Sequence, residues 1–152
     1  KKNVLASPRR FRVVQAGQAT GELWGGNLSM TVATIGSRFE IPSRGILFLE
    51  EVSEPRYRID RMFAQLALAG FFRRIRGLIL GDFTDAGGRS HSEAWLREIV
   101  RRYLGSRKIP VLSNLRAGHQ HGDVLLPIGG LVRIEANGRR LVLPPLVRVE
   151  PA

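Results

Sequence analysis

The sequence predicts an α/β domain with a mixed sheet, two main helices and β-hairpins at both ends of the chain. Between residues 45 and 112, short apolar runs alternate with amphipathic helical patterns, which is typical of parallel strands joined by helical crossovers. Near the C-terminus, the Asn137-Gly138 pair lies between two β-rich runs, the strongest short-range signal for a tight hairpin. The length of 152 residues and a hydrophobic content of 43% fit one globular domain with a single core.

The N-terminal region is expected to hold a strand and a second hairpin. Residues 11–15 are β-rich, and the glycines in the following GQATGELWGG indicate a hairpin or a bulged turn. Asn27 can cap a short helix that runs toward Gly36, although β-branched residues weaken the helical pattern there. Residues 1–10 have the composition of a linker and lack the apolar stretch of a signal peptide. We therefore expect a domain over residues 11–152 within a longer protein.

The central region predicts three strands, at residues 45–50, 77–81 and 109–112, with a main helix after each of the first two. Pro55 is tolerated in the first turn of a helix, and Gly70 supplies a stop for that helix. Ser90 and Glu93 have capping-box spacing at the start of the other helix. The apolar positions at helical spacing are Ile59, Met62, Phe63 and Leu66 in the first helix and Leu96, Ile99, Val100 and Tyr103 in the second.

The composition restricts the partners and the chemistry of this domain. The 24 Lys and Arg residues against 13 Asp and Glu residues give a net charge of +11, which favours anionic partners. These basic residues form short, scattered groups without interleaved aromatic residues, so we do not expect nucleic-acid binding. The sequence contains no apolar run of about 18 residues, so it predicts no membrane-spanning helix. The absence of cysteine excludes disulfides, thiolate nucleophiles and cysteine-based zinc sites.

Two adjacent carboxylates, Glu50 and Glu51, follow the apolar run of residues 45–49. A carboxylate at the end of a core strand must be solvated, paired or used in chemistry, because burying it alone is costly. Neighbouring residues on a strand point to opposite faces, so one carboxylate can face a cleft while the other meets solvent or a basic group. The carboxyl end of a strand is also where α/β folds place ligands.

The histidines give several alternatives for a reactive site. His119 and His121 lie in the loop sequence AGHQHGD, where either could be a general base or an incidental surface residue. A zinc site from His119, His121 and Asp123 matches no helical ligand pattern, so we expect no metal. His91 lies within the capping-box segment and is interpreted as a loop residue. Glu50 and His119 would form two thirds of a Ser-His-Glu triad, but no serine lies in a G-x-S-x-G elbow.

Four motifs in order resemble the C-terminal half of the LD-carboxypeptidase family: GGNLS at 25–29, ILFLEEVSEPRYRIDRMFAQLALAG at 46–70, GLILGDFTD at 77–85 and AGHQHGDVLLPIGG at 117–130. This family of serine peptidases includes muramoyltetrapeptide carboxypeptidases and microcin C self-immunity peptidases. The resemblance implies a swivelling β/β/α domain that supplies the glutamate and histidine of a Ser-Glu-His triad. It also implies removal of the terminal D-alanine from murein tetrapeptides in the cytoplasm, without a metal or a cofactor.

The resemblance assigns roles to individual residues. It implies that Glu50 and His119 are catalytic and that the nucleophilic serine belongs to an N-terminal domain outside this chain, so the isolated chain is expected to be inactive. His121 is less typical of the family, and His119 is favoured as the base because it directly follows Gly118, as in the family.

Asn27 and Glu54 are the candidate substrate-binding residues. Asn27 matches a family position near the active-site cleft, with a helix N-cap as the alternative role. Glu54 occupies a position where microcin-cleaving members carry a lysine, which favours muropeptides as substrates. Family members usually carry aspartate at the position of Glu51, which is expected to lie off the catalytic face.

Two other function classes remain as alternatives to a peptidase domain. The first is a non-catalytic domain that binds an anionic polymer through its positive charge. The second is a structural or dimerisation module, which would form a stable oligomer through an apolar face. The partners expected for the peptidase are a murein peptide, the N-terminal domain of the same protein and, as an option, a second copy of the chain.

Overall fold

A computed structural model describes residues 3–6, 11–38, 44–119 and 124–144 of the chain. The helices are α1 (Leu28–Ala33), α2 (Arg56–Leu68), α3 (Phe71–Arg74) and α4 (Glu93–Leu104). The strands are β1 (Asn3–Ala6), β2 (Arg12–Gln15), β3 (Gln18–Asn27), β4 (Ile46–Glu51), β5 (Gly77–Phe83), β6 (Val111–Ser113), β7 (Leu131–Glu135) and β8 (Arg140–Leu143). Within these residues, no helix has the length and apolar character needed to cross a membrane.

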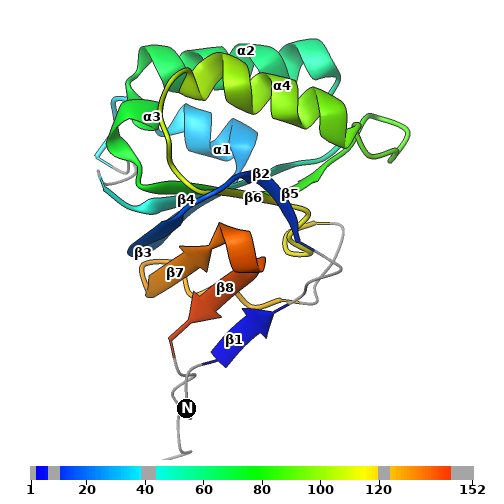
Figure 1. The fold of residues 1–152 in the computed structure, drawn as a ribbon. Coiled ribbons are helices and arrows are strands. Elements are labelled where there is room, and N and C mark those ends of the chain that lie inside the picture. The colour runs from blue at the N-terminus through cyan, green and yellow to red at the C-terminus, as the bar shows by residue number, and fades with distance from the viewer. Residues whose placement is uncertain (1–2, 7–10, 39–43, 120–123, 145–152) are drawn as a thin grey trace, which may run out of the picture.

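The strands form one mixed sheet in the order β1-β8-β7-β3-β4-β5-β6-β2. The central pairs β3-β4, β4-β5 and β5-β6 are parallel, and the remaining pairs are antiparallel. The four helices lie together over one face of the central strands (Figure 1). Every residue of β4 is buried, as expected for a parallel strand that is covered on both faces. The α/β fold with a mixed sheet and two main helices is therefore confirmed.

The long strand β3 divides the sheet into two parts. Its first half, from Gln18 to Glu22, pairs with β7, and its second half, from Leu23 to Asn27, pairs with β4. The sheet curls at this point, so that β7, β8 and β1 lie under the face opposite the helices (Figure 1). The result is a β/β/α arrangement of three layers, as the resemblance implies.

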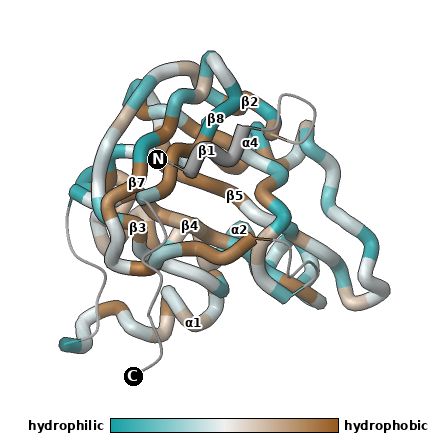
Figure 2. The backbone as a smooth tube through the Cα atoms, turned by 90° about the horizontal axis from the view of Figure 1, so that it is seen from below, coloured by the Kyte–Doolittle hydropathy of each residue, from teal (hydrophilic) through white to brown (hydrophobic). Residues whose placement is uncertain are grey.

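Each interface between layers has its own apolar core, and the central strands that separate the cores are strongly hydrophobic (Figure 2). The helix-side core is centred on Phe63 of α2, which is fully buried. Its ring lies 5.7 Å from that of Phe72 and about as close to the rings of Phe83 and Tyr103. The opposite core packs Phe48 and Ile79 against residues of β7 and β8.

Replacing Phe63 by alanine is expected to lower the free energy of unfolding by about 3–5 kcal/mol, because the change leaves a cavity among three aromatic rings. Urea denaturation followed by circular dichroism measures this loss. Leu68→Ala is the matched control, because Leu68 lies on the same helix but is 86% exposed. Equal losses in the two variants would contradict the central place of Phe63 in the core.

The expected N-terminal hairpin is wrong, whereas the C-terminal hairpin is confirmed. Strand β2 pairs with β6, and β3 pairs with β7. The two strands expected to form the hairpin therefore pair with other strands and not with each other. Strands β7 and β8 form the predicted antiparallel hairpin. Their connection is longer than a two-residue turn: a 3₁₀ turn at Ala136–Gly138 is followed by Arg139, whose φ is 51°.

Two local expectations also differ from the structure. Strand β1 lies inside the segment expected to be a linker, where it pairs with β8. Helix α4 is capped by Ser92, whose hydroxyl accepts the N–H of Trp95, and not by Ser90. Ser90 instead forms a β-bridge with Thr84 in the loop after β5, so its backbone is already paired three residues before the helix begins.

Candidate active site

The two adjacent glutamates of β4 point to opposite faces of the sheet, as strand alternation predicts. Leu49 packs in the helix-side core, Glu50 projects into the opposite layer, and Glu51 returns to the helix side. Both carboxylates are buried. The expectation that the second one meets solvent or a basic group is wrong, because Glu51 accepts hydrogen bonds from uncharged groups near α1.

The carboxylate of Glu50 meets the imidazole of His119. Nδ1 of His119 lies 2.9 Å from Oε1 of Glu50, and the two residues are 69 positions apart in the sequence. The Glu50 side chain is 3% exposed, whereas that of His119 is 60% exposed. Because a carboxylate can only accept, this contact favours the tautomer with the proton on Nδ1 and the lone pair on Nε2. In this tautomer, the outer nitrogen of the imidazole is the one that can accept a proton.

Two glycines leave room for the Glu50 side chain. A Cβ atom on Gly81 of β5 would lie 3.0 Å from Cβ of Glu50. A Cβ on Gly118 would lie 2.9 Å from Cδ and Oε2 of the same carboxylate, and Gly118 has a φ of +107°. Oε2 of Glu50 is buried and accepts no hydrogen bond from the described residues. A buried carboxylate with an unused oxygen costs stability, which is characteristic of functional positions.

Asn27 lies beside Glu50, because the two residues are paired in the register of β3 and β4. Its Oδ1 accepts the N–H of Met30 at 3.1 Å, so the helix N-cap expected from the sequence is confirmed. Its Nδ2 donates to Oε1 of Glu51 at 2.8 Å. Asn27 therefore has a structural contact on each side of its amide, and its backbone lies next to that of Glu50.

Glu54 lies in the loop between β4 and α2 and forms an ion pair with Arg58, at 3.3 Å, one turn along the helix. The backbone of this loop is held at two points: the N–H of Glu54 donates to the carbonyl of Thr84, and Nε2 of His91 lies 2.8 Å from the carbonyl oxygen of Glu54. His91 thus has a specific contact in the loop. Within the described residues, the structure brings the side chains of Glu50 and His119 together, with Asn27 paired to Glu50 through the backbone of β3 and Glu54 on the loop that follows β4.

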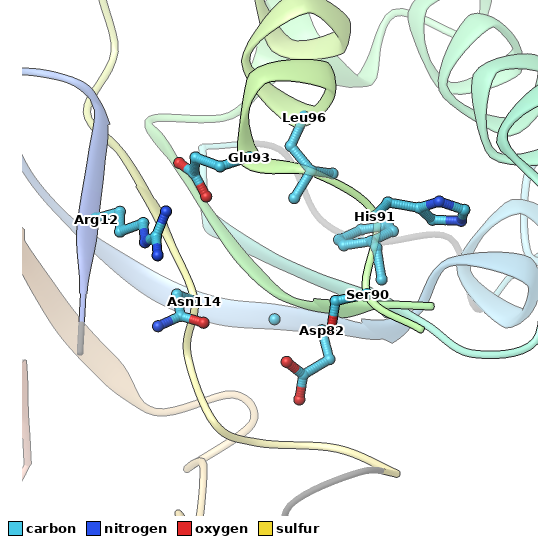
Figure 3. A pocket seen from close by; sticks show the side chains of 9 residues that line it. Arg12, Asp82, Ser90, His91, Glu93, Leu96 and Asn114 are labelled. Carbon is cyan, nitrogen blue, oxygen red and sulfur yellow. The ribbon is translucent and has the colours of Figure 1, made fainter. Parts of the chain in front are cut away.

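Two depressions lie at the carboxyl ends of the central strands. The first has a volume of about 250 Å³ and is lined mainly by apolar groups, including Trp24, Met30 and Ile128, with Asn27 at its wall. The second has a volume of about 270 Å³ and is polar (Figure 3). Figure 3 shows Arg12, Glu93, Asn114 and Asp82 around it, while the imidazole of His91 points away. Of the residues that line the first depression, Asn27 was expected from the sequence, whereas Trp24 was not, because a tryptophan before two glycines is no specific signal.

The described residues contain no cluster of three or more histidine, aspartate or glutamate side chains suited to a metal ion. His121 and Asp123, which entered the alternative zinc site, lie outside the described residues, and so does the choice between His121 and His119 as the base.

Residues 20–134 match the family described as the LD-carboxypeptidase C-terminal domain. This span is most of the chain and includes Glu50, His119, Asn27 and Glu54. The protein therefore belongs to the LD-carboxypeptidase family through this domain.

The relatives of this chain are carboxypeptidases and microcin-immunity proteins. It is 36% identical over 129 residues to a Bacillus subtilis protein named "probable murein peptide carboxypeptidase", covering 84% of this chain and 40% of that protein. It is 31% identical over 122 residues to the murein tetrapeptide carboxypeptidase of Pseudomonas aeruginosa, covering 79% of this chain and 39% of that protein. A solved structure of MccF in complex with glutamyl sulfamoyl guanosine superimposes with a TM-score of 0.75 and 25% identity, covering 90% of this chain and 41% of that one. The chain thus spans about 40% of the length of these relatives.

Proposed function

We propose that this domain supplies Glu50 and His119 to the Ser-His-Glu triad of a serine-type LD-carboxypeptidase that removes the terminal D-alanine from murein tetrapeptides. The nucleophilic serine would come from an N-terminal domain of the longer protein. The enzyme would act in the cytoplasm, as the family resemblance implies, and would need no metal or cofactor.

The observation that carries this proposal is the contact between His119 and Glu50. A buried carboxylate holds Nδ1 of an exposed imidazole at 2.9 Å, which is the geometry of the base and its orienting acid in a hydrolytic triad. Within the described residues, no hydrogen bond joins this imidazole to a serine hydroxyl, so the third member would have to approach its exposed side.

The proposed mechanism assigns one task to each group. Nε2 of His119 takes the proton of the serine hydroxyl as its oxygen attacks the carbonyl carbon of the peptide bond. Glu50 stabilises the imidazolium that results. The imidazolium then gives its proton to the nitrogen of the departing D-alanine, and a water molecule, activated by the same histidine, hydrolyses the acyl-enzyme.

We place the substrate along the edge where β3 and β4 end. Asn27 lies beside Glu50 and can offer an amide N–H to a peptide carbonyl, and the adjoining apolar depression can receive uncharged parts of the substrate. Glu54 carries its negative charge on the neighbouring loop, partly offset by Arg58. The other expected partner is the N-terminal domain. A homodimer is a further option.

The test of the proposed function is D-alanine release from a murein tetrapeptide, measured by mass spectrometry. We expect release by the full-length protein and none by residues 1–152 alone, because the nucleophile would be missing. Release of D-alanine by the pure 152-residue chain would contradict the placement of the serine. No release by the full-length protein would refute the peptidase proposal.

Cleavage of a peptide-nucleotide is the second candidate, because the similar MccF structure holds glutamyl sulfamoyl guanosine. This sequence resembles a family whose microcin-cleaving members carry lysine at the position of the acidic Glu54. We therefore expect weaker turnover of a peptide-nucleotide than of the tetrapeptide. Comparing kcat/KM for the two substrates separates the candidates. Glu54→Lys should raise the ratio in favour of the nucleotide compound.

Binding of an anionic polymer is less well supported, because several arginines have contacts inside the domain. The guanidinium of Arg107 donates to the carbonyl oxygens of Phe72, Arg73 and Ile75 at the C-terminal end of α3. Arg102 bridges Asp60 and Glu98. These side chains cap a helix or join two helices, and their charge is partly neutralised.

A further inference from the structure

The carboxylate of Glu51 lies under the start of α1 and is 4% exposed. Its Oε1 accepts from Nδ2 of Asn27 at 2.8 Å and from the N–H of Val52 at 3.1 Å. Its Oε2 accepts from the N–H and the hydroxyl of Ser29, at 2.9 and 2.6 Å. Four donors match the acceptor capacity of an ionised carboxylate.

All four donors are uncharged groups: an amide, a hydroxyl and two backbone N–H groups. A buried carboxylate without a cation is costly, and an apolar side chain of similar size would avoid that cost. The arrangement therefore indicates that Glu51 is useful for what it holds in place. Charge-assisted hydrogen bonds are about twice as strong as neutral ones and give a fixed geometry.

Among the groups that Glu51 holds is the amide of Asn27, which has a second partner on its other side. The amide oxygen accepts the N–H of Met30, and one N–H of Nδ2 donates to Glu51. Turning the amide over would set its oxygen against the carboxylate and its NH₂ group against a backbone N–H. Only one orientation satisfies both neighbours, so the second N–H of Nδ2 also has a single direction.

We propose that Glu51 is a positioning residue that locks the Asn27 amide so that its second N–H donates to a carbonyl or carboxylate oxygen of the bound peptide. The location supports this role, because Asn27 is paired with Glu50 in the sheet and lines the apolar depression. The peptide as ligand rests on the proposed function, whereas the locking of the amide does not. Glu51 acts from the face of β4 opposite to Glu50, so it controls binding separately from the His119 contact.

The variant Glu51→Gln tests the lock with almost no change in shape. Glutamine puts an NH₂ donor where one acceptor oxygen stood, so either Asn27 and Val52 or the N–H of Ser29 meets another donor. We expect KM for the tetrapeptide to rise about tenfold, with kcat within about threefold of the native value. A merely structural defect would reduce the folded fraction and so lower kcat without raising KM. Glu98→Gln, an exposed carboxylate on α4 that loses the same charge, is the control.

A double-mutant cycle with Asn27→Ala tests whether Glu51 acts through Asn27. We expect KM of the double variant to equal that of Asn27→Ala alone, because Glu51 has nothing left to position. Independent, multiplying effects of the two changes on KM would overturn the proposal, and so would a native KM in Glu51→Gln.

The lock can also be measured without catalysis, in full-length protein labelled with ¹⁵N-asparagine. The side-chain amide protons of Asn27 should keep native shifts in Glu98→Gln and move toward free-amide values in Glu51→Gln. Unchanged Asn27 signals in Glu51→Gln would overturn the positioning role. If the native protein released no D-alanine, the proposed function would fail. The NMR measurement would still show whether Glu51 fixes the orientation of the Asn27 amide.

Discussion

Replacing His119 by alanine in the full-length protein is expected to lower kcat for D-alanine release by about 10³-fold to 10⁶-fold, because the proposed triad would lose its base. Glu50→Gln is expected to cost up to about 10⁴-fold, because an amide in place of the carboxylate no longer selects the His119 tautomer with a free Nε2. The measurement is steady-state kinetics with the tetrapeptide.

The two changes should combine far less than multiplicatively, because triad members act as a unit. A double variant of Glu50 and His119 is therefore expected to match the His119 variant alone. His91→Ala is the control histidine, since its ring contacts the Glu54 carbonyl and not Glu50. Near-native turnover in His119→Ala would remove this residue from the mechanism and direct attention to His121.

Local patterns in the sequence were sufficient for elements whose partners are near in the chain. The helices α2 and α4 follow from apolar spacing, and the cap of α1 follows from Asn27. Alternation along β4 predicts that Glu50 and Glu51 face opposite sides of the sheet. The N-terminal hairpin failed because the partners of β2 and β3 lie about 100 residues further on, at β6 and β7. A pairing set by distant strands leaves no trace in the local pattern.

In the candidate site too, local features could be predicted from the sequence and long-range contacts could not. Residue types and spacing alone left His119 and His121 as equal candidates, and only the family resemblance favoured His119. The buried state of Glu51 was missed because its donors on Asn27 and Ser29 lie 24 and 22 residues away in the sequence. The motif GGNLS indicates a helix cap, but the contact with a carboxylate on another strand depends on the fold.

The substitution Gly118→Ala is expected to be nearly as damaging to kcat as the loss of Glu50. The new Cβ would lie 2.9 Å from three atoms of the Glu50 side chain, a separation that real contacts do not show. Either the carboxylate or the loop must move, and His119 follows directly on that loop. We expect kcat to fall by about 10²-fold to 10⁴-fold as the 2.9 Å contact between His119 and Glu50 is broken.

A matched glycine separates the collision from backbone strain. Gly88 also has a positive φ, +75°, but a Cβ there would meet nothing within 4 Å. Gly88→Ala should cost about 1 kcal/mol of unfolding free energy and leave kcat unchanged. Steady-state kinetics gives kcat for both variants, and urea denaturation gives their free energies of unfolding. Equal kcat values in the two variants would mean that the loop relaxes without disturbing Glu50. A selective loss in Gly118→Ala would explain why glycine precedes this histidine: no other residue leaves space for the carboxylate that orients it.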